Sequence, residues 1–482
     1  MIDDNQLIDM IVEEFEGFAK CPRPSHHEKL ISNHLVKRLN DLGVTNVVQD
    51  ETNNVIADIP ATEGYENAPL TLLQGHMDMV CVAKPGVPFD PLTSPIKLVR
   101  EGNILRADGT SLGADDGAGI AAILLLLRFG AAHGPLRVIF TTDEETAMTG
   151  AQRLDPKYIR DLKNIINCDS ESLDVICLGS AGCCHLVFNR DLHREPPAGD
   201  MALAITASDF KGGHSGETIH QGKSNAIQAL SDLLLSLRGT VSFRLASFKG
   251  GDAANAIPAN ATAVIVINGT DEAAVKDAVK ARQEVISRIY KGIEDKANFT
   301  VAATELPKGV FSAEDTDMTI DLLSLLHCGT FVMNQEFPLL PELSANIGTI
   351  ETTESRVSFQ YFPRAGGDDR LNVFLEKMPV FAKLTGFTLE KGSQEPAWTV
   401  NPDSRLAPLY GKAFTKITGG TARMEAIHGG LETGRFYHLN PDADIISVGP
   451  NTHHIHSANE SVELDSVATW VRILAETLSS MK

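Results

Sequence analysis

A histidine and an aspartate stand two residues apart at the end of an apolar segment, because His76 and Asp78 follow Leu70–Leu73. The segment reads as a buried strand, and residues i and i+2 of a strand point to the same face. His76 can therefore bind a metal through one ring nitrogen. Asp78 can accept a hydrogen bond from the other nitrogen or from a neighbouring ligand. On its own, this spacing is equally consistent with a capped turn after a core strand.

Acidic residues follow two further apolar segments of the same kind. The segment 136–142 ends in the adjacent Glu144 and Glu145, and the segment 164–167 ends in Asp169. In an α/β sheet, ligands bind at the carboxyl ends of the strands, so three such strands indicate one shared site. On an extended backbone the two adjacent glutamates point in different directions, so one can bind metal while the other acts as a base.

Two more acids, Asp115 and Asp116, precede an apolar helix predicted over 118–128. A helix dipole favours negative charge at this end, so capping is the alternative to a ligand role for either residue. We expect Asp116 to be a helix-start or supporting acid rather than a ligand. A late loop carries His453, His454 and His456, and a solvated surface histidine is the alternative to a ligand role for each of them.

The composition limits the classes of function. The chain has 482 residues, which exceeds what one hydrophobic core organises, so two or more domains are expected. A net charge of -21 argues against nucleic acid or an anionic membrane as a partner. The acidic N-terminus does not resemble a signal peptide, and no apolar run reaches the ~18–20 residues of a membrane span. Seven cysteines without a CxxC pair favour a reducing cytoplasm.

The order of the predicted strands and helices changes along the chain. Strands and helices alternate up to about residue 184, and an α+β pattern follows up to about residue 391. A capping box at Ser25–Glu28 predicts the start of the first of these helices. The predicted helices are 29–42, 118–128, 224–237, 271–290, 404–418 and 465–481, and the predicted strands include 46–50, 55–60, 185–189, 202–208, 261–267 and 445–448.

The residues singled out by position have the chemistry of a hydrolytic metal site. Histidines and carboxylates without cysteine suit zinc, manganese or cobalt. Two cations about 3.5–4 Å apart need a bridging ligand, and a carboxylate can give one oxygen to each. The set is His76, Asp78, Asp115, Glu144, Glu145, Asp169 and His456.

Seven short motifs occur in the order found in the M20 family of di-zinc metallopeptidases, which this chain resembles over nearly its whole length. The motifs are HMD, GADDG, DEE, NCDSE, GGHSG, NAIP and the closing His-Ser of HHIHSANE. The segments GADDGAGIAA, TTDEETAMTG and HGGLETG are most similar in sequence to the aminoacyl-histidine dipeptidase branch of that family.

The resemblance implies a role for each metal-site residue. Asp115 would bridge two zinc ions. His76 and Asp169 would complete the protein ligands of one ion. Glu145 and His456 would complete those of the other ion, and cobalt or manganese would be possible substitutes for zinc.

The resemblance also implies the residues that handle the substrate. Asp78 would orient the ligands, and Glu144 would be the general base and later the acid. His214 would reach a substrate on the partner subunit of a homodimer and help to hold the oxyanion. The candidates for substrate binding are His214, Asn255, Arg364 and His428. From its residues alone, Arg364 is either a binding residue or an ordinary solvated arginine.

The expected fold is an α/β, di-zinc aminopeptidase-like catalytic domain in two segments, 1–184 and 396–482, with an α+β lid and dimerisation domain, 185–395, inserted between them. The expected activity is that of a cytoplasmic, zinc-dependent dipeptidase, with Xaa-His substrates as one preference. Two alternatives remain: an N-acyl amino acid deacylase or tripeptidase of the same chemistry, and an inactive protein that binds metal or peptide.

Overall fold

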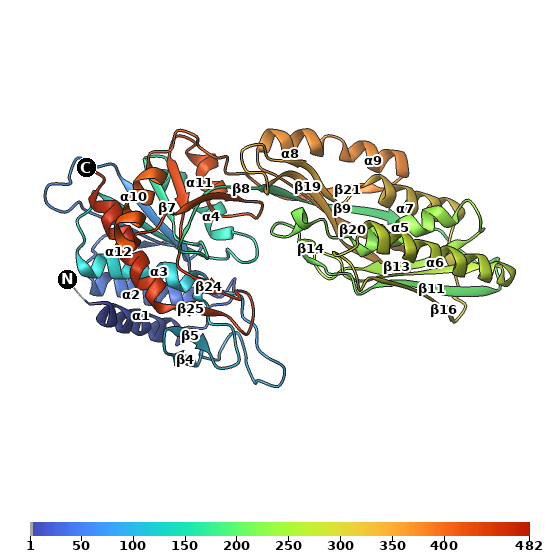
Figure 1. Cartoon of the computed structure of the whole chain (residues 1–482), viewed down its shortest axis with the longest axis horizontal. Helices are drawn as coiled ribbons and strands as arrows, with labels where there is room; N and C mark the ends of the chain where they lie inside the picture. The colour runs from blue at the N-terminus through green and yellow to red at the C-terminus, as the bar shows by residue number, and fades with distance from the viewer. Residues whose placement is uncertain (1–2) are drawn as a thin grey trace. The chain divides into compact units, whose positions relative to one another are not determined.

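The computed structural model describes residues 3–482, and the chain divides into two compact units. Unit 1 consists of Met1–Gly179, Val400–Ala426 and Leu431–Lys482, and unit 2 of Ser180–Thr399 and Ile427–Gly430. Figure 1 gives the order of the elements along the chain. No helix of the described residues is both long and apolar enough to cross a bilayer.

Unit 1 alternates strands and helices, as the sequence predicts. Its main elements are α1 (Asp4–Phe18), α2 (Lys29–Asp41), β1 (Val47–Gln49), β2 (Val55–Ile59), β3 (Thr71–His76), β4 (Leu98–Glu101), β5 (Ile104–Ala107), α3 (Ala114–Phe129), β6 (Leu136–Thr141), α4 (Thr149–Arg153), β7 (Asn164–Asn167), β8 (Val175–Ser180), α10 (Leu406–Thr418), β22 (Arg423–Ile427), α11 (Thr433–Leu439), β23 (Asp444–Ser447), β24 (Thr452–His453), β25 (Ser461–Glu463) and α12 (Leu464–Ser479).

The main sheet of unit 1 has eight strands in the order β1-β2-β6-β3-β7-β23-β8-β22. Strand β3 pairs in parallel with β6 on one side and β7 on the other, and β7 pairs in parallel with β23. Every residue of β3 and of β6 is buried. The carboxyl ends of these neighbouring parallel strands therefore meet at one edge of the sheet, which confirms the predicted convergence.

Helices α1, α3, α10 and α12 supply much of the core of unit 1. Helix α12 packs against the other three, and α3 also packs on strand β3. Trp470 and Phe15 are completely or almost completely buried in this cluster. The amphipathic pattern that predicted a C-terminal helix thus reflects a face that is buried against these neighbours.

The capping box predicted at the start of α2 is wrong. The Ser25 hydroxyl donates to Asp78 Oδ2 at 2.7 Å, and Glu28 Oε1 accepts from the backbone N–H groups of His26 at 2.8 Å and Asp143 at 3.0 Å. Both side chains hold loops at the carboxyl ends of β3 and β6 instead of capping the helix. Tertiary partners have replaced the local hydrogen bonds that the spacing suggested.

Unit 2 is an α+β unit built on a second sheet. Its main elements are β9 (Gly182–Asp191), β10 (Arg194–Glu195), β11 (Met201–Ser208), β12 (Gly213–His214), α5 (Ala226–Leu237), β13 (Arg244–Gly250), β14 (Ala256–Ile257), β15 (Ala261–Ile267), α6 (Glu272–Ile289), β16 (Asn298–Thr304), β17 (Val310–Phe311), α7 (Ala313–Leu325), β18 (Gly329–Met333), β19 (Pro341–Thr352), β20 (Arg356–Ala365), α8 (Asp368–Leu375), α9 (Met378–Thr385) and β21 (Thr388–Glu395).

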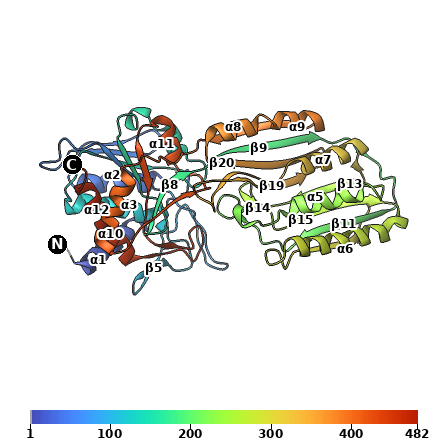
Figure 2. The same cartoon turned by 45° about the horizontal axis from the view of Figure 1, so that its top comes forward.

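The large sheet of unit 2 consists of two halves with mirrored strand order. Its path is β16-β11-β15-β13-β19-β20-β9-β21, and β18 pairs with β19 beside it. One half runs β11-α5-β13-β15-α6-β16, and the other runs β9-α7-β19-β20-α8/α9-β21. Each is a split β-α-β arrangement, and the two halves join where Gly250 of β13 pairs with Ile350 of β19. Helices α6, α5, α7 and α9 contact one another in series and so form one layer. Figure 2 draws these helices with the strands of unit 2.

Candidate active site

The five predicted metal-binding residues of unit 1 converge from distant parts of the chain. His76 ends β3, Asp115 lies at the start of α3, and Glu145 follows β6. Asp169 follows β7, and His456 lies in the loop between β24 and β25. The strands place their ends at one edge of the sheet, and the late loop returns to the same edge.

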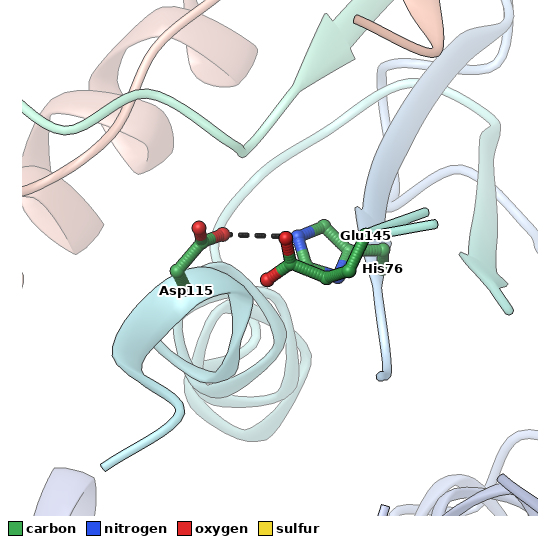
Figure 3. Close-up of side chains that lie close together, drawn as sticks. All are labelled: His76, Asp115 and Glu145. Carbon is green, nitrogen blue, oxygen red and sulfur yellow. Dashed lines mark hydrogen bonds and ion pairs between the residues drawn. The ribbon is translucent and has the colours of Figure 1, made fainter. Parts of the chain in front are cut away.

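Asp115 lies between the two histidines. Its Oδ1 is 2.9 Å from His76 Nε2, and its Oδ2 is 3.1 Å from His456 Nε2. Figure 3 shows the first of these contacts, with the carboxylate of Glu145 beside the His76 ring. A carboxylate whose two oxygens face different nitrogen ligands has the arrangement needed to bridge two cations.

Two further ligand pairs surround Asp115. His76 Nε2 is 3.4 Å from Asp169 Oδ1, and His456 Nε2 is 2.9 Å from Glu145 Oε2. One ligand atom from each of His76, Asp115 and Glu145 lies within 4.8 Å of the others. The contacts thus divide the residues into a His76–Asp169 pair and a His456–Glu145 pair, with Asp115 common to both.

The cluster concentrates negative charge away from water. Burial raises the pKa of Asp169 to about 7. Hydrogen bonds to Asp115 and Glu145 raise the pKa of His456 to about 11. Burial alone would lower the pKa of His76, but the carboxylates of Asp169 and Asp115 raise it well above its ordinary value. Such a field of clustered carboxylates attracts a cation.

The donor set fits divalent metal ions. Glu145 Oε1 is buried without a hydrogen-bond partner among residues 3–482. Oxygen and imidazole donors without a thiolate suit zinc, cobalt and manganese. The buried, partnerless carboxylate oxygen of Glu145 is an atom for which a metal ion would supply the missing contact.

Asp78 supports the site through the backbone as well as through His76. Its Oδ1 accepts from the Glu144 N–H at 3.0 Å, and its Oδ2 accepts from the Glu145 N–H at 3.2 Å. Its Oδ1 also lies 3.5 Å from His76 Nδ1. Since both N–H groups point at one carboxylate, Glu144 and Glu145 lie in a turn, and the extended backbone assumed from the sequence is wrong.

Glu144 has the properties of a proton carrier. The side chain is partly buried, and burial raises the pKa of its carboxyl well above the usual value, with Asp169 and Glu145 adding repulsion. A carboxyl group with a raised pKa can both take and return a proton near neutral pH. Within this turn, Glu145 contacts His456 while the neighbouring Glu144 has no part in that ligand pair.

Asp116 supports the helix, as expected for a helix-start acid. Its Oδ1 accepts from the Gly119 N–H at 3.0 Å, and its Oδ2 accepts from the His76 N–H at 3.2 Å. The backbone of Asp115 and Asp116 is not helical, so the regular helix begins after them. Asp116 thus caps the helix and leaves Asp115 facing the histidines. The exposed His453 pairs with Glu463, away from the cluster.

Sequence reasoning assigned no role to several buried charged residues of unit 1, among them Arg23, Glu432 and Glu460. Glu432 Oε2 accepts from Gln74 Nε2 and Thr141 Oγ1, each at 2.6 Å, and burial raises the pKa of Glu432 to about 8. It therefore ties β3 to β6 beneath their ends. In the sequence, the only sign of a role for Glu432 is that it is the single acid of the motif HGGLETG.

In unit 2, Arg364 and His428 are each only 4 % exposed. The solvated alternative for Arg364 is therefore wrong. Arg364 lies opposite Ser344 in the pairing of β19 with β20, and Ser344 Oγ is 2.7 Å from His428 Nε2. The Arg364 guanidinium carbon lies 4.8 Å from the centre of the Phe362 ring.

This polar cluster retains donors and acceptors without protein partners. Arg364 Nε and His428 Nδ1 are buried without a hydrogen-bond partner among the described residues. Burial lowers the pKa of His428 to about 3, so its ring is neutral near pH 7. A buried guanidinium beside unpartnered polar atoms is suited to an anionic ligand such as a carboxylate.

His214 and Asn255 are neighbours in unit 2. The short strands β12 and β14 place His214 opposite Ala256, and the Ser215 N–H donates to the Asn255 carbonyl at 2.8 Å. The His214 side chain is 32% exposed, and its Nδ1 lies 3.2 Å from Glu217 Oε1. The fold thus brings together two residues that the sequence proposed separately for substrate binding.

Comparison with known proteins yields a match over most of the chain. The model of Peptidase family M20/M25/M40 matches residues 72–480. The cytosol non-specific dipeptidase of Escherichia coli (strain K12) is 31% identical over 469 residues, which cover 97% of this chain and 96% of that protein.

Solved structures give a matching fold. The crystal structure of aminoacylhistidine dipeptidase from Vibrio alginolyticus aligns with a TM-score of 0.86 and 29% identity, over 98% of this chain and 96% of that chain. Aminopeptidase PepT from Bacillus cereus aligns with a TM-score of 0.57 at 17% identity, over 98% of each chain, and this similarity concerns the fold alone.

Proposed function

The chain belongs to Peptidase family M20/M25/M40, and we propose that it is a dipeptidase that uses two metal ions in unit 1. The observation that carries this proposal is the position of Asp115, whose two carboxylate oxygens face His76 and His456 separately. The names of the Escherichia coli and Vibrio alginolyticus relatives support a dipeptide as the substrate.

Zinc is the proposed metal, with cobalt or manganese as substitutes. His76 and Asp169 would hold one ion, His456 and Glu145 the other, and Asp115 both. The orphaned Glu145 Oε1 and the clustered carboxylates support this assignment. When bound, the two ions supply Lewis acidity that lowers the pKa of water and polarises the peptide carbonyl.

The chain's own residues carry the proton and position the reacting groups. Glu144 takes a proton from the attacking water and later gives it to the leaving amine. Asp78 holds the Glu144 backbone and the His76 ring through the contacts described above. We propose that His214 donates a hydrogen bond to the oxyanion of the tetrahedral intermediate.

The substrate's terminal carboxylate is proposed to bind Arg364, with His428 and Asn255 near its other polar groups. The buried guanidinium and its unpartnered Nε support this role. The name of the Vibrio alginolyticus relative supports a preference for substrates with a C-terminal histidine.

We further propose that unit 1 is the catalytic domain, that unit 2 is the lid and dimerisation domain, and that two copies form a homodimer in which His214 serves the partner's site. A cytoplasmic location is proposed from the seven free cysteines and from the name of the Escherichia coli relative. No nucleic acid or membrane partner is proposed, because the net charge is -21.

Metal removal and a substrate panel test the proposed function. The protein is stripped of metal with a chelator and assayed with and without added zinc. The panel contains dipeptides including Xaa-His, one tripeptide and N-acetyl amino acids. We expect the stripped protein to lose activity and zinc to restore cleavage of the dipeptides, because the ligand set cannot lower the pKa of water on its own.

The other outcomes of this panel would contradict the proposal in different ways. Cleavage confined to the N-acetyl amino acids or to the tripeptide would retain the metal chemistry and reject the dipeptide as substrate. Two bound metals without any cleavage would favour the alternative of an inactive binding protein. Activity that survives complete metal removal would reject the metal-dependent mechanism.

Arg364→Met is expected to lower kcat/KM for dipeptides about a hundredfold, which corresponds to about 2.7 kcal/mol. The variant removes the charged donor but keeps much of its buried volume. The measurement compares each dipeptide with its C-terminally amidated form. The amidated form should be a poor substrate of the original protein. The substitution should change the kcat/KM of the amidated form about threefold or less, because that substrate has no terminal carboxylate for Arg364 to bind.

Arg370→Met is a matched control for Arg364→Met. Arg370 is also in unit 2, but its side chain is 47% exposed and pairs with Glu342 at 3.2 Å. This control should retain the original kcat/KM with both substrates. An equal loss for the free and amidated dipeptides in Arg364→Met would show that Arg364 does not bind the terminal carboxylate.

A further inference from the structure

The buried carboxylate of Glu460 accepts four hydrogen bonds from the loop that carries Asp115. Its Oε2 accepts from the backbone N–H groups of Leu112 at 2.8 Å and Gly113 at 2.9 Å. Its Oε1 accepts from those of Ala114 at 2.7 Å and Asp115 at 3.2 Å. Glu460 is 3% exposed, and helix α3 has no capping side chain at Gly113, its own N-cap position. A carboxylate far along the chain thus satisfies the first N–H groups of this segment.

Arg23 holds the same loop from its carbonyl side. Its Nη1 donates to the carbonyl oxygens of Met77 at 2.9 Å and Asp78 at 3.1 Å, and its Nη2 donates to that of Gly113 at 2.5 Å. Arg23 is also 3% exposed, and the Glu460 charge helps to keep its guanidinium protonated against the effect of burial. Arg23 thus joins the backbone that follows β3 to Gly113, and Glu460 holds the same loop through its N–H groups.

Glu460 also belongs to the loop that carries His456, only four residues earlier in the sequence. One carboxylate therefore connects the segment of His456 with the segment of Asp115, which are otherwise 341 residues apart. The backbone of His456 has a positive φ of 58°, a conformation that a non-glycine residue keeps only where its surroundings hold it.

We propose that Glu460 is a positioning residue that sets the separation of Asp115 and His456, and thereby holds the metal site of His456, Glu145 and Asp115 in its binding geometry. This inference rests on the proposed function, because it takes those three residues as metal ligands. Groups that orient ligands without touching the metal contribute about 10–100-fold to metal affinity.

The charge of Glu460 matters as well as its shape. A glutamine at this position offers only one acceptor oxygen, and its NH₂ group would face two backbone N–H donors. At least two of the four N–H groups would then be buried without an acceptor, which loosens the loop. The site of His456 would be affected through both of its anchored segments, whereas the His76–Asp169 site would be affected through Asp115 alone.

The test is a Zn²⁺ titration of metal-free Glu460→Gln against a competing chelator, beside the original protein. We expect one of the two Zn²⁺ ions to bind about 10–100-fold more weakly and the other to change about threefold or less. The unfolding temperature of the metal-free protein is measured in parallel. It should fall, because the buried N–H groups left without an acceptor destabilise the fold. The result that identifies a role in positioning is therefore the difference between the two ions, which a general loss of stability would not produce.

Glu463→Gln is the matched control. Glu463 lies three residues further along, in β25, and its side chain is 30% exposed and contacts His453 and Asn451 rather than residues 112–115. This control should bind both Zn²⁺ ions as the original protein does. Glu460→Asp keeps the charge with a shorter reach, so it should recover part of the lost affinity and serves as the test variant if Glu460→Gln does not fold.

Two results would overturn the inference. Unchanged affinity for both ions in Glu460→Gln and Glu460→Asp would show that the four hydrogen bonds do not position the ligands. Equal weakening of both ions together with a large fall in the unfolding temperature would assign Glu460 a purely structural role. Failure of the original protein to bind two Zn²⁺ ions would instead contradict the proposed function itself, and the two failures are therefore distinguishable.

Discussion

Glu144→Gln is expected to retain both metal ions and to lose dipeptidase activity about a thousandfold, or about 4 kcal/mol of transition-state stabilisation. The amide has nearly the shape of the carboxyl group but can neither take nor return a proton. Burial raises the pKa of Glu144, and this suits a group that must do both near neutral pH. The loss should appear in kcat with little change in KM, because the proton transfer belongs to the transition state.

Glu145→Gln, at the adjacent position, separates the base from the ligand. Glu145 Oε2 lies 2.9 Å from His456 Nε2, so we expect this variant to lose metal as well as activity. The measurement is metal content per chain, together with kcat for one dipeptide at saturating zinc. A fully active Glu144→Gln would reject Glu144 as the base. Metal loss from Glu144→Gln but not from Glu145→Gln would exchange their assigned roles.

Asp115→Ala is expected to abolish the metal centre and to lower activity about ten-thousandfold or more, which is over 5 kcal/mol. Both of its oxygens face histidines of the site, at 2.9 and 3.1 Å, so their removal takes a ligand from each ion. Excess zinc should restore little activity.

Asp108→Asn is the matched control for Asp115→Ala. Asp108 precedes the same helix, but its side chain is 52% exposed and pairs with Lys97. Metal content, measured after dialysis, should be close to two per chain in this control and near zero in Asp115→Ala. Two tightly bound ions in Asp115→Ala would show that another residue bridges them, and full activity would reject the proposed centre.

The sequence by itself determined the strands and the acids that follow them. The apolar segments that end at His76 and before Glu144 and Asp169 are strands β3, β6 and β7. Each is a short run of apolar residues, and a run of this length is typical of a buried strand. Their parallel pairing follows from the helices between them. The same local logic placed α3 and α12 within a few residues.

The tertiary structure alone decided which polar groups meet. Ser25 and Glu28 have capping-box spacing, yet they bind Asp78 and the backbone of Asp143, since partners remote in sequence satisfy them better. Arg364 carries no local sign that β19 and β20 bury it. These contacts depend on how the loops return to the sheet, and the spacing of residues in the sequence does not predict the course of a loop.

The loop after β24 is the sharpest case of this division. The motif around His456 predicts that it is a ligand. Only the fold shows that Glu460 accepts hydrogen bonds from the four N–H groups of residues 112–115. Hydrogen bonds between segments more than 340 residues apart are not reflected in any periodic pattern of the sequence. Local pattern therefore determines the elements and the candidate ligands, whereas the buried hydrogen bonds that hold those ligands together arise only when the elements pack.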